Sequence, residues 1–371
     1  MIPMLYPATE TQFNTLGLGA LADAVSCVVT SEKNLPPTLE MEYPISGALF
    51  YQIATERIIY APTYGDNDQP FRIYSISKPI NGIVTVKAAH VAELLSKTVM
   101  PNKVIPNATP TRIWQSIRAN ARPLPQFTFS SDIVDPPTIR ADGEVVIPEP
   151  CSVMRVFIEN EESIANLWKN GGFIYDKWNI TYNDNVGDDS DFVIEYGRNM
   201  TGIEASADMT DVYTGIYPYW KPNYTDSYEI LSNDPVIYAS NVHDYTSPMV
   251  KAMSFQDYYD ENLSRSELED VIRTAATSYL ESSQHVLKVS IKVDFLDLSR
   301  TDQYRSTPTP DVKLYDRVRV YYPELDVDIS SQVVKTTYDV LGEKYDSIEV
   351  GEVEKNLATV ISEIARRSVS I

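Results

Sequence analysis

Residues 71–96, FRIYSISKPINGIVTVKAAHVAELLS, change hydrophobic period once along their length. Apolar residues first recur at every second position, the period of a half-buried β-strand, as Val84, Val86 and Ala88. They then follow the i, i+3, i+4 spacing of a helix, as Val91, Leu94 and Leu95. KPING (78–82) supplies turn residues between two strands. The stretch therefore predicts strand, turn, strand and short helix, with the helix lying against the sheet or at its edge.

The composition favours the same β-rich architecture. The 371 residues are 43% hydrophobic, which is enough for a sizeable core and for several packed units. Tyr is abundant at 25 residues, and Pro reaches 24 while Gly is only 14. Tyrosine suits pleated surfaces, whereas proline suits sheet edges and loops. We therefore expect many strands and few helices.

The formal net charge is −21. Such an acidic chain is not suited to gripping phosphate backbones, so most acids are interpreted as a solvated surface, and some as repelling nucleic acid or a like-charged partner. The sequence contains no run of 18 apolar residues, and MIPMLYPATE (1–10) has neither the basic nor the apolar region of a signal peptide. We expect synthesis in the cytoplasm and no membrane insertion.

Further strands and helices follow from local patterns. In residues 26–45, apolar and polar residues alternate, which predicts a hairpin with one solvent-exposed face. Thr109 caps a predicted helix that begins at Pro110, and residues 152–172 predict a strand followed by a helix. The sequence 264–280 is the clearest helix, opened by a capping box and carrying an apolar face of Leu268, Val271, Ile272, Ala275 and Tyr279.

The last third of the chain predicts a compact β unit and a terminal helix. Residues 286–298, 313–322 and 331–352 read as strands, with a turn near Leu341 and Gly342. Residues 353–371 are amphipathic with roughly heptad spacing. They predict a helix that either docks on the domain or begins a longer coil, and we favour the coil.

Motifs for catalysis or cofactor binding are missing from the sequence. His90, His243 and His285 match no zinc pattern, and neither a G-x-S-x-G elbow nor a Walker loop occurs. Cys27 and Cys151 are expected to be buried thiols. GLGALADA (17–24) is interpreted as a turn, and the acidic loop at 183–191 fails calcium-loop spacing. We predict no catalytic, cofactor-binding or metal-binding residue, although counting acids does not rule out a glycosidase pair.

Several stretches, taken in order, resemble one family. They are QPFRIYSISKPINGIVTVKAAHV (69–91), LWKNGGFIYDKWNI with FVIEYGRNMTGI (167–203), VSIKVDFLDL (289–298) and LYDRVRVYYPELDVDISSQVVKTTYDVLGEKYDSIEVGE (314–352). Together they are similar to the phage minor structural proteins of the tail tip, also called prophage endopeptidase tail or tail-associated lysin proteins. The likeness covers nearly the whole chain.

The resemblance implies a multi-domain, baseplate-hub-like α+β fold with two small antiparallel β-barrels from each subunit of a homotrimer. Residues 1–100 plus 173–220 would form the first tube barrel and 286–352 the second. Residues 101–172 plus 221–285 would be peripheral α/β domains, and 353–371 would lead out of the hub. The 71–96 unit would be barrel wall with its covering helix.

The resemblance also implies a structural role in the virion. The trimer would continue the tail tube at the tail tip, contact the distal tail, tube and tape-measure proteins, and let DNA pass without specific binding. Peptidoglycan hydrolase activity in this family is expected in a C-terminal extension, so residues 1–371 are not predicted to be an enzyme.

Two alternatives remain open at this stage. The chain could be a receptor- or glycan-binding tail component, with Trp168, Trp178 and Trp220 as possible sugar platforms. It could also be the N-terminal part of a cell-wall hydrolase, which the histidine pattern disfavours.

Overall fold

The computed structural model describes residues 1–64, 67–77, 81–124, 126–137, 143–160, 162–208, 212–281, 288–295, 312–323 and 327–351. The chain forms two compact units. Unit 1 comprises the described residues of 1–204 and 291–353, and unit 2 those of 205–290. The predicted terminal helix at 353–371 lies outside the described residues.

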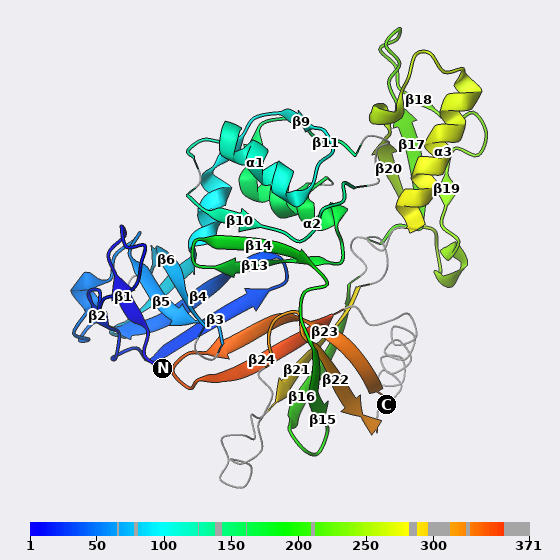
Figure 1. Ribbon diagram of the computed structural model, residues 1–371. Helices are drawn as coiled ribbons and strands as arrows, with labels where there is room; N and C mark the ends of the chain where they lie inside the picture. The colour runs from blue at the N-terminus through cyan, green and yellow to red at the C-terminus, as the bar shows by residue number, and fades with distance from the viewer. Residues whose placement is uncertain are drawn as a thin grey trace. The chain divides into compact units, whose positions relative to one another are not determined.

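The β-rich fold class is confirmed. The largest sheet that the structure describes has 13 strands, in the order β16-β21-β24-β23-β3-β4-β7-β6-β5-β1-β2, with β22 paired to β23 and β15 to β22 (Figure 1). Its strands are β1 (Met4–Tyr6), β2 (Gly19–Ala20), β3 (Ser26–Glu32), β4 (Leu35–Pro44), β5 (Ile58–Pro62), β6 (Asp68–Ile76), β7 (Ile83–His90), β15 (Asp189–Glu195), β16 (Met200–Asp208), β21 (Lys288–Phe295), β22 (Arg317–Tyr322), β23 (Val327–Asp339) and β24 (Lys344–Gly351).

The 71–96 stretch forms the two predicted strands and the helix. β6 and β7 pair antiparallel, and the helix after them is the 3₁₀ helix η2 (Val91–Lys97). Val84, Val86 and Ala88 are buried, as their alternation predicts. The side chain of His90 caps η2 by accepting a hydrogen bond from the Ala92 amide at 3.2 Å. Residues 78–80 of the predicted turn lie outside the described residues.

Strand β23 is the most connected strand of the large sheet, because three strands pair with it. Its first half pairs antiparallel with β22, from Val327–Tyr322 to Gln332–Arg317, and its second half pairs antiparallel with β3, from Lys335–Glu32 to Asp339–Val28. β24 pairs along its other edge. The β23–β3 pair thus joins the C-terminal β region to the N-terminal one without a break.

A second core in unit 1 lies between short helices and short strands. Its helices are α1 (Pro110–Asn120), η2, the π-helix η3 (Arg155–Glu159) and α2 (Ile164–Leu167). Its strands form small sheets: β8 (Val99–Met100) with β12 (Cys151–Ser152), β9 (Lys103–Ile105) with β11 (Val145–Ile147), and β10 (Thr128–Ser130), β14 (Asn179–Asp184) and β13 (Gly171–Asp176). The core contains stacked aromatic rings, for example Phe157 on Phe173 with centroids 4.8 Å apart.

Unit 2 is a small sheet with one long helix. β17 (Gly215–Trp220) is central, with β18 (Glu229–Ile230) and β19 (Ile237–Tyr238) on one edge and β20 (Val250–Ser254) on the other. α3 (Arg265–Glu281) packs its apolar stripe on Trp220 and its neighbours. The remaining elements are the 3₁₀ helices η1 (Phe50–Gln52, in unit 1), η4 (Val242–Asp244) and η5 (Gln256–Tyr258).

Helix caps form as the sequence predicts. Thr109 accepts from the Arg112 amide at 3.2 Å, and Ser264 and Glu267 bond each other at the start of α3. The predicted face of α3 needs correction, since Val271 is exposed and the buried stripe follows the 3.6-residue period as Leu268, Ile272, Ala276 and Leu280.

Two segments, one after residue 152 and one after Gly143, differ from what their sequence patterns predict or are only partly described. Most of the strand expected after residue 152 is the π-helix η3, because Val156 and Phe157 turn into the aromatic core instead of alternating across a sheet. The strand after Gly143 (β11) pairs with β9. Asp142-Gly143 is a dipeptide typical of a two-residue hairpin turn, but residues 138–142 lie outside the described residues.

Three segments meet at Asn34, the turn residue between β3 and β4. Its side-chain Oδ1 accepts from the Phe173 amide at 3.1 Å, and its carbonyl accepts from the Tyr175 hydroxyl at 2.9 Å. The Tyr315 hydroxyl accepts from the Asn34 amide at 2.9 Å and donates to the Phe173 carbonyl at 2.8 Å. We call Asn34, Phe173, Tyr175 and Tyr315 the turn junction. It ties the β3–β4 and β13–β14 hairpins to the segment entering β22.

The turn junction predicts a large effect of removing one oxygen atom. Tyr315→Phe leaves the Asn34 amide and the Phe173 carbonyl without a partner in a buried site, which costs about 1 to 3 kcal/mol of unfolding free energy. Urea unfolding followed by tryptophan fluorescence measures the change. Tyr51→Phe, at a side chain 90% exposed, is the matched control and should leave the midpoint unchanged. Equal midpoints for Tyr315→Phe and the wild type would contradict the structural role of the junction.

Candidate functional site: pockets and exposed apolar surfaces

The residues that the sequence offered for chemistry do not come together. His90 is fully buried in unit 1, His243 is exposed in unit 2, and His285 lies outside the described residues. Cys27 and Cys151 are buried free thiols, as predicted, and burial raises the pKa of Cys27 to about 12. Within the described ranges, no group of three His, Cys, Asp or Glu could hold a metal ion.

His90 is the centre of a buried polar network. Its Nδ1 accepts from the Ala92 amide, so the proton is assigned to Nε2, which faces Gln69 Oε1 at 3.3 Å. Gln69 Oε1 also accepts from the Lys177 amide at 2.7 Å, and its Nε2 donates to Asp176 at 3.1 Å. Burial lowers the pKa of His90 to about 3, against a smaller opposing effect of Asp176. The network ties β6 and β7 to the β13–β14 turn and holds a neutral imidazole.

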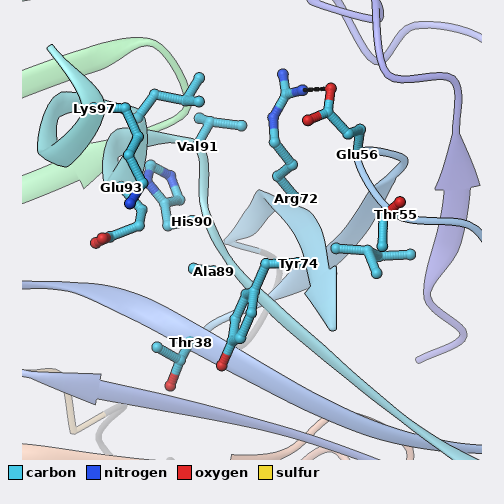
Figure 2. A pocket seen from close by; sticks show the side chains of 12 residues that line it. Thr38, Thr55, Glu56, Arg72, Tyr74, Ala89, His90, Val91, Glu93 and Lys97 are labelled. Atoms are coloured by element: carbon cyan, nitrogen blue, oxygen red, sulfur yellow. Dashed lines mark ion pairs between the residues drawn. The ribbon is translucent and has the colours of Figure 1, made fainter. Parts of the chain in front are cut away.

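The larger pocket lies next to this network, between β6, β7 and η2. Its volume is about 570 Å³, and its apolar wall is formed by Ile73, Ala89, Val91 and Leu94. Figure 2 shows Arg72 and Glu56 on one side, 3.6 Å apart as an ion pair, and Glu93 and Lys97 on the other. Thr38, Thr55, Tyr74 and His90 complete the lining.

This pocket lacks the arrangement that general acid–base catalysis needs. His90 is the one imidazole in the lining, and both of its ring nitrogens are occupied by Ala92 and Gln69. The charged side chains at the rim lie in or near water, where a single exposed ion pair contributes little. The described lining therefore offers no free imidazole as a general base.

A second pocket of about 450 Å³ lies beside the turn junction. Its lining is polar and includes Lys33, Lys169, Arg317, Asp188 and Asp189. Its floor is tight at Gly187, where φ is +95° and an added Cβ would lie 2.1 Å from the Tyr315 carbonyl oxygen. Only glycine fits this close approach, so at Gly187 the backbone itself forms the pocket wall.

The three tryptophans proposed as sugar platforms have other positions. Trp220 is fully buried in the core of unit 2, so it is not available to a ligand. Trp178 is partly buried against Phe127, with ring centroids 5.3 Å apart. Trp168 is partly buried too, and its Nε1 donates to the Asp135 carbonyl at 3.2 Å.

An exposed apolar surface lies at the N-terminal end of the large sheet. Tyr51 is 90% exposed and Leu16 is 80% exposed. The ring of Phe50 lies against that of Tyr51, with centroids 5.2 Å apart, and both Leu49 and Phe50 are half-buried. Leu49 Cδ1 lies 3.3 Å from the position of a Cβ on Gly19, three residues after Leu16. We call Leu16, Leu49, Phe50 and Tyr51 the N-terminal apolar patch. Such patches on soluble proteins are typical of protein–protein contact sites.

In the part of the chain that the structure describes, no helix is long and apolar enough to cross a membrane.

Comparison with solved structures identifies the class to which this fold belongs. The chain is similar to the prophage tail protein gp18 from Listeria monocytogenes EGD-e, with a TM-score of 0.55 at 12% identity over 99% of both chains. It is similar to a 43 kDa tail protein of prophage MuSo2 from Shewanella oneidensis, with a TM-score of 0.54 at 9% identity over 95% of this chain and 98% of that one. A tail protein from Neisseria meningitidis MC58 gives 0.51 at 10% identity, over 88% and 91%.

The fold is therefore that of phage tail proteins. Within that class, residues 188–361 match the prophage endopeptidase tail family, which confirms the resemblance drawn from the four sequence stretches. No curated protein matches the chain. The family match and the shared fold support a structural role in a phage tail.

The buried imidazole predicts how stability depends on pH. The pKa of His90 is lowered from 6.5 to about 3 by folding, so the unfolded chain binds more protons between these values and stability is lost as pH falls through this window. His90→Asn keeps an acceptor near the Nδ1 position but does not titrate. Between pH 6 and 4 the wild type should lose up to about 1.4 kcal/mol per pH unit more than this variant.

Urea unfolding at a series of pH values measures the difference. His243→Asn, at an exposed histidine, serves as the control and should follow the wild type. Parallel pH profiles for His90→Asn and the wild type would show that His90 titrates normally in the folded protein.

Proposed function

We propose that this chain is the tail-tip hub of a long-tailed phage, a homotrimer that continues the tail tube and attaches the distal tail components. The observation that carries the proposal is the fold it shares with a prophage tail protein over 99% of both chains. The family match over residues 188–361 supports it independently at the level of sequence.

The large sheet of unit 1 suits the wall of a tube. Its N-terminal and C-terminal β regions are joined edge to edge through β3 and β23. We assign the first tube barrel to 1–100 with 173–220 and the second to 286–352. Residues 101–172 with 221–285 are the peripheral parts, and 353–371 lead out of the hub. Two β regions per subunit let three subunits approximate the sixfold symmetry of a tube ring.

The N-terminal apolar patch is proposed as the contact with the next subunit. A ring of three needs a heterologous contact, in which two different surfaces of neighbouring subunits meet. Tyr51, 90% exposed, and Leu16, 80% exposed, gain burial energy only when another molecule covers them. The patch lies at the β2 end of the sheet, where no further described strand pairs.

The acid excess of the chain suits a channel for DNA. A net charge of −21 repels phosphates and keeps DNA from binding to the wall during transit. The partners proposed are the distal tail protein, the tail tube and the tape-measure protein, and the location is the tail tip of the virion after synthesis in the host cytoplasm. We assign no enzymatic activity to these residues; any peptidoglycan cleavage would belong to a further C-terminal region.

The hub proposal predicts a trimer in the assembled tail. When the 41.8 kDa chain is co-produced with the tube and distal tail proteins of the same phage, the complex should contain three copies and show a threefold ring with a central channel. Native mass spectrometry and electron microscopy along the symmetry axis measure copy number and symmetry. Six copies in a ring, or copies attached outside the tube, would contradict the proposal.

The subunit contact has its own prediction. Leu16→Glu with Tyr51→Glu places two charges in the N-terminal apolar patch and should prevent ring formation in the same assembly, while the unfolding midpoint of the isolated chain is unchanged because both side chains are exposed. Val134→Glu, at a side chain 78% exposed elsewhere in unit 1, is the control and should still assemble. Normal rings from the double variant would exclude the patch as the contact.

A further inference from the structure

The sheet of unit 2 has one covered face and one open face. Ile216 and Trp220 of β17 are fully buried and share one core with the apolar stripe of α3. Because side chains alternate along a strand, Tyr217 and Tyr219 point the other way, and both are half-buried. No described element of unit 2 provides an apolar cluster over that second face.

Strand register places four phenol rings in a row on the open face. Tyr238 of β19 pairs with Gly215, and an added Cβ at Gly215 would lie 3.1 Å from the Tyr238 ring. Tyr217 and Tyr219 follow along β17 at intervals of about 7 Å. The ring of Tyr228 then meets that of Tyr219 edge-on, with centroids 5.3 Å apart. The row runs along β17 for more than the roughly 13 Å between Gly215 and Tyr219.

Small and apolar residues border the row. On the same face of β20 lie Val250, Ala252 and Ser254, which are opposite Gly215, Tyr217 and Tyr219 in the parallel register. Ile230 of β18 is opposite Tyr219. Tyr228 and Tyr238 are 67% and 51% exposed, and Val250 is 43% exposed. We call Tyr217, Tyr219, Tyr228 and Tyr238 with their small neighbours the tyrosine track.

The tyrosine track is uncharged although the protein is strongly acidic. None of the described strand residues on this face is Lys, Arg, Asp or Glu, whereas the whole chain has a net charge of −21. The charged neighbours Lys251 and Glu229 are in register with Ile216 and Trp220 and therefore belong to the α3 side. A partner that depends on charge finds no counter-charge on this face, so an uncharged partner fits it best.

We propose that the tyrosine track binds an uncharged polysaccharide, with successive sugar rings seated on successive tyrosines. A sugar ring has an apolar C–H face that packs on an aromatic ring, and hydroxyl groups that bond phenol hydroxyls; tyrosine offers both an apolar body and a polar tip. A row of rings that follows one strand suits a linear, extended ligand. The tyrosine side chains lose little entropy on binding, since each has few rotatable bonds.

A second copy of this chain fits the track less well. Two copies that met face to face would bring two strongly acidic proteins together, which costs electrostatic repulsion. The track lies in unit 2 and shares no residue with the N-terminal apolar patch, although Tyr217 and Tyr219 fall within 173–220, the range proposed above for the first tube barrel. Sugar binding is measured on the isolated chain, so its outcome is distinguishable from that of the ring assembly.

Isothermal titration of the full chain tests the proposal. The probes are uncharged hexasaccharides of glucose, N-acetylglucosamine, galactose, mannose and rhamnose, with heparin and polygalacturonate as charged comparators. We expect at least one uncharged hexasaccharide to bind and both charged polymers to fail. Tyr217→Ala with Tyr219→Ala should weaken binding at least tenfold, and the two Tyr→Phe changes together by only a few-fold, because the rings remain.

Control variants separate binding from folding. Tyr258→Ala removes an exposed tyrosine of unit 2 outside the track and should bind like the wild type. Ala252→Glu puts a charge beside Tyr217 without touching the core and should weaken binding at least tenfold even if the double alanine variant does not fold. The proposal is overturned if no uncharged probe binds, if only the charged polymers bind, or if Ala252→Glu binds normally. Self-association lost in Ala252→Glu without sugar binding would identify a second copy as the occupant.

Discussion

The hydrogen bond from the Tyr315 hydroxyl to the Phe173 carbonyl, 2.8 Å long and buried, is the contact on which the arrangement of unit 1 depends. The same oxygen accepts from the Asn34 amide, so one phenol satisfies two backbone groups from segments far apart in sequence. Burial raises the pKa of both Tyr315 and Tyr175. Both hydroxyls therefore remain protonated donors, and the junction holds in a medium where unpaired polar groups are costly.

The turn junction explains how one strand can support the whole large sheet. Just past Tyr315, Asp316 uses its buried carboxylate to accept from the Asp188 and Lys313 amides, which fixes the entry into β22. From there β22 pairs with the first half of β23, and the second half of β23 pairs with β3. Asn34 lies in the turn directly after β3 and bonds Tyr315, so it connects β3 back to the segment that enters β22. The hydrogen bonds of the Tyr315 hydroxyl join residues 281 and 142 positions apart, and such non-local contacts cost more loop-closure entropy than the contacts within a hairpin.

Individual strands and helix caps of this fold could be predicted from the sequence, because they depend only on residues close together in the chain. The alternation in 71–96 and 26–45 required only a period of two, and the cap at Thr109 required only three residues. The β23–β3 pairing could not be predicted, because any exposed strand edge offers the same backbone groups and the partner is chosen by packing. The π-helix at Arg155–Glu159 follows from Phe157 stacking on Phe173, a contact that no period in the sequence shows. Division of the chain into two tube barrels and peripheral parts stays a prediction.

The candidate surfaces were hidden from sequence reasoning for a related reason. The role of His90 could not be predicted, because it depends on residues distant in sequence. His90 faces Gln69 of β6, and Gln69 in turn accepts from the Lys177 amide of the β13–β14 turn. Tryptophan was the residue proposed for sugar platforms. Its ring is the largest aromatic surface and therefore gains the most free energy from burial, and Trp220 is indeed in the core. Tyrosine can stay at a surface because its hydroxyl keeps one end hydrated. In an acidic protein, an acidic partner can approach an uncharged aromatic surface with little electrostatic repulsion, which is why we propose the N-terminal apolar patch and the tyrosine track as the contact surfaces of this chain.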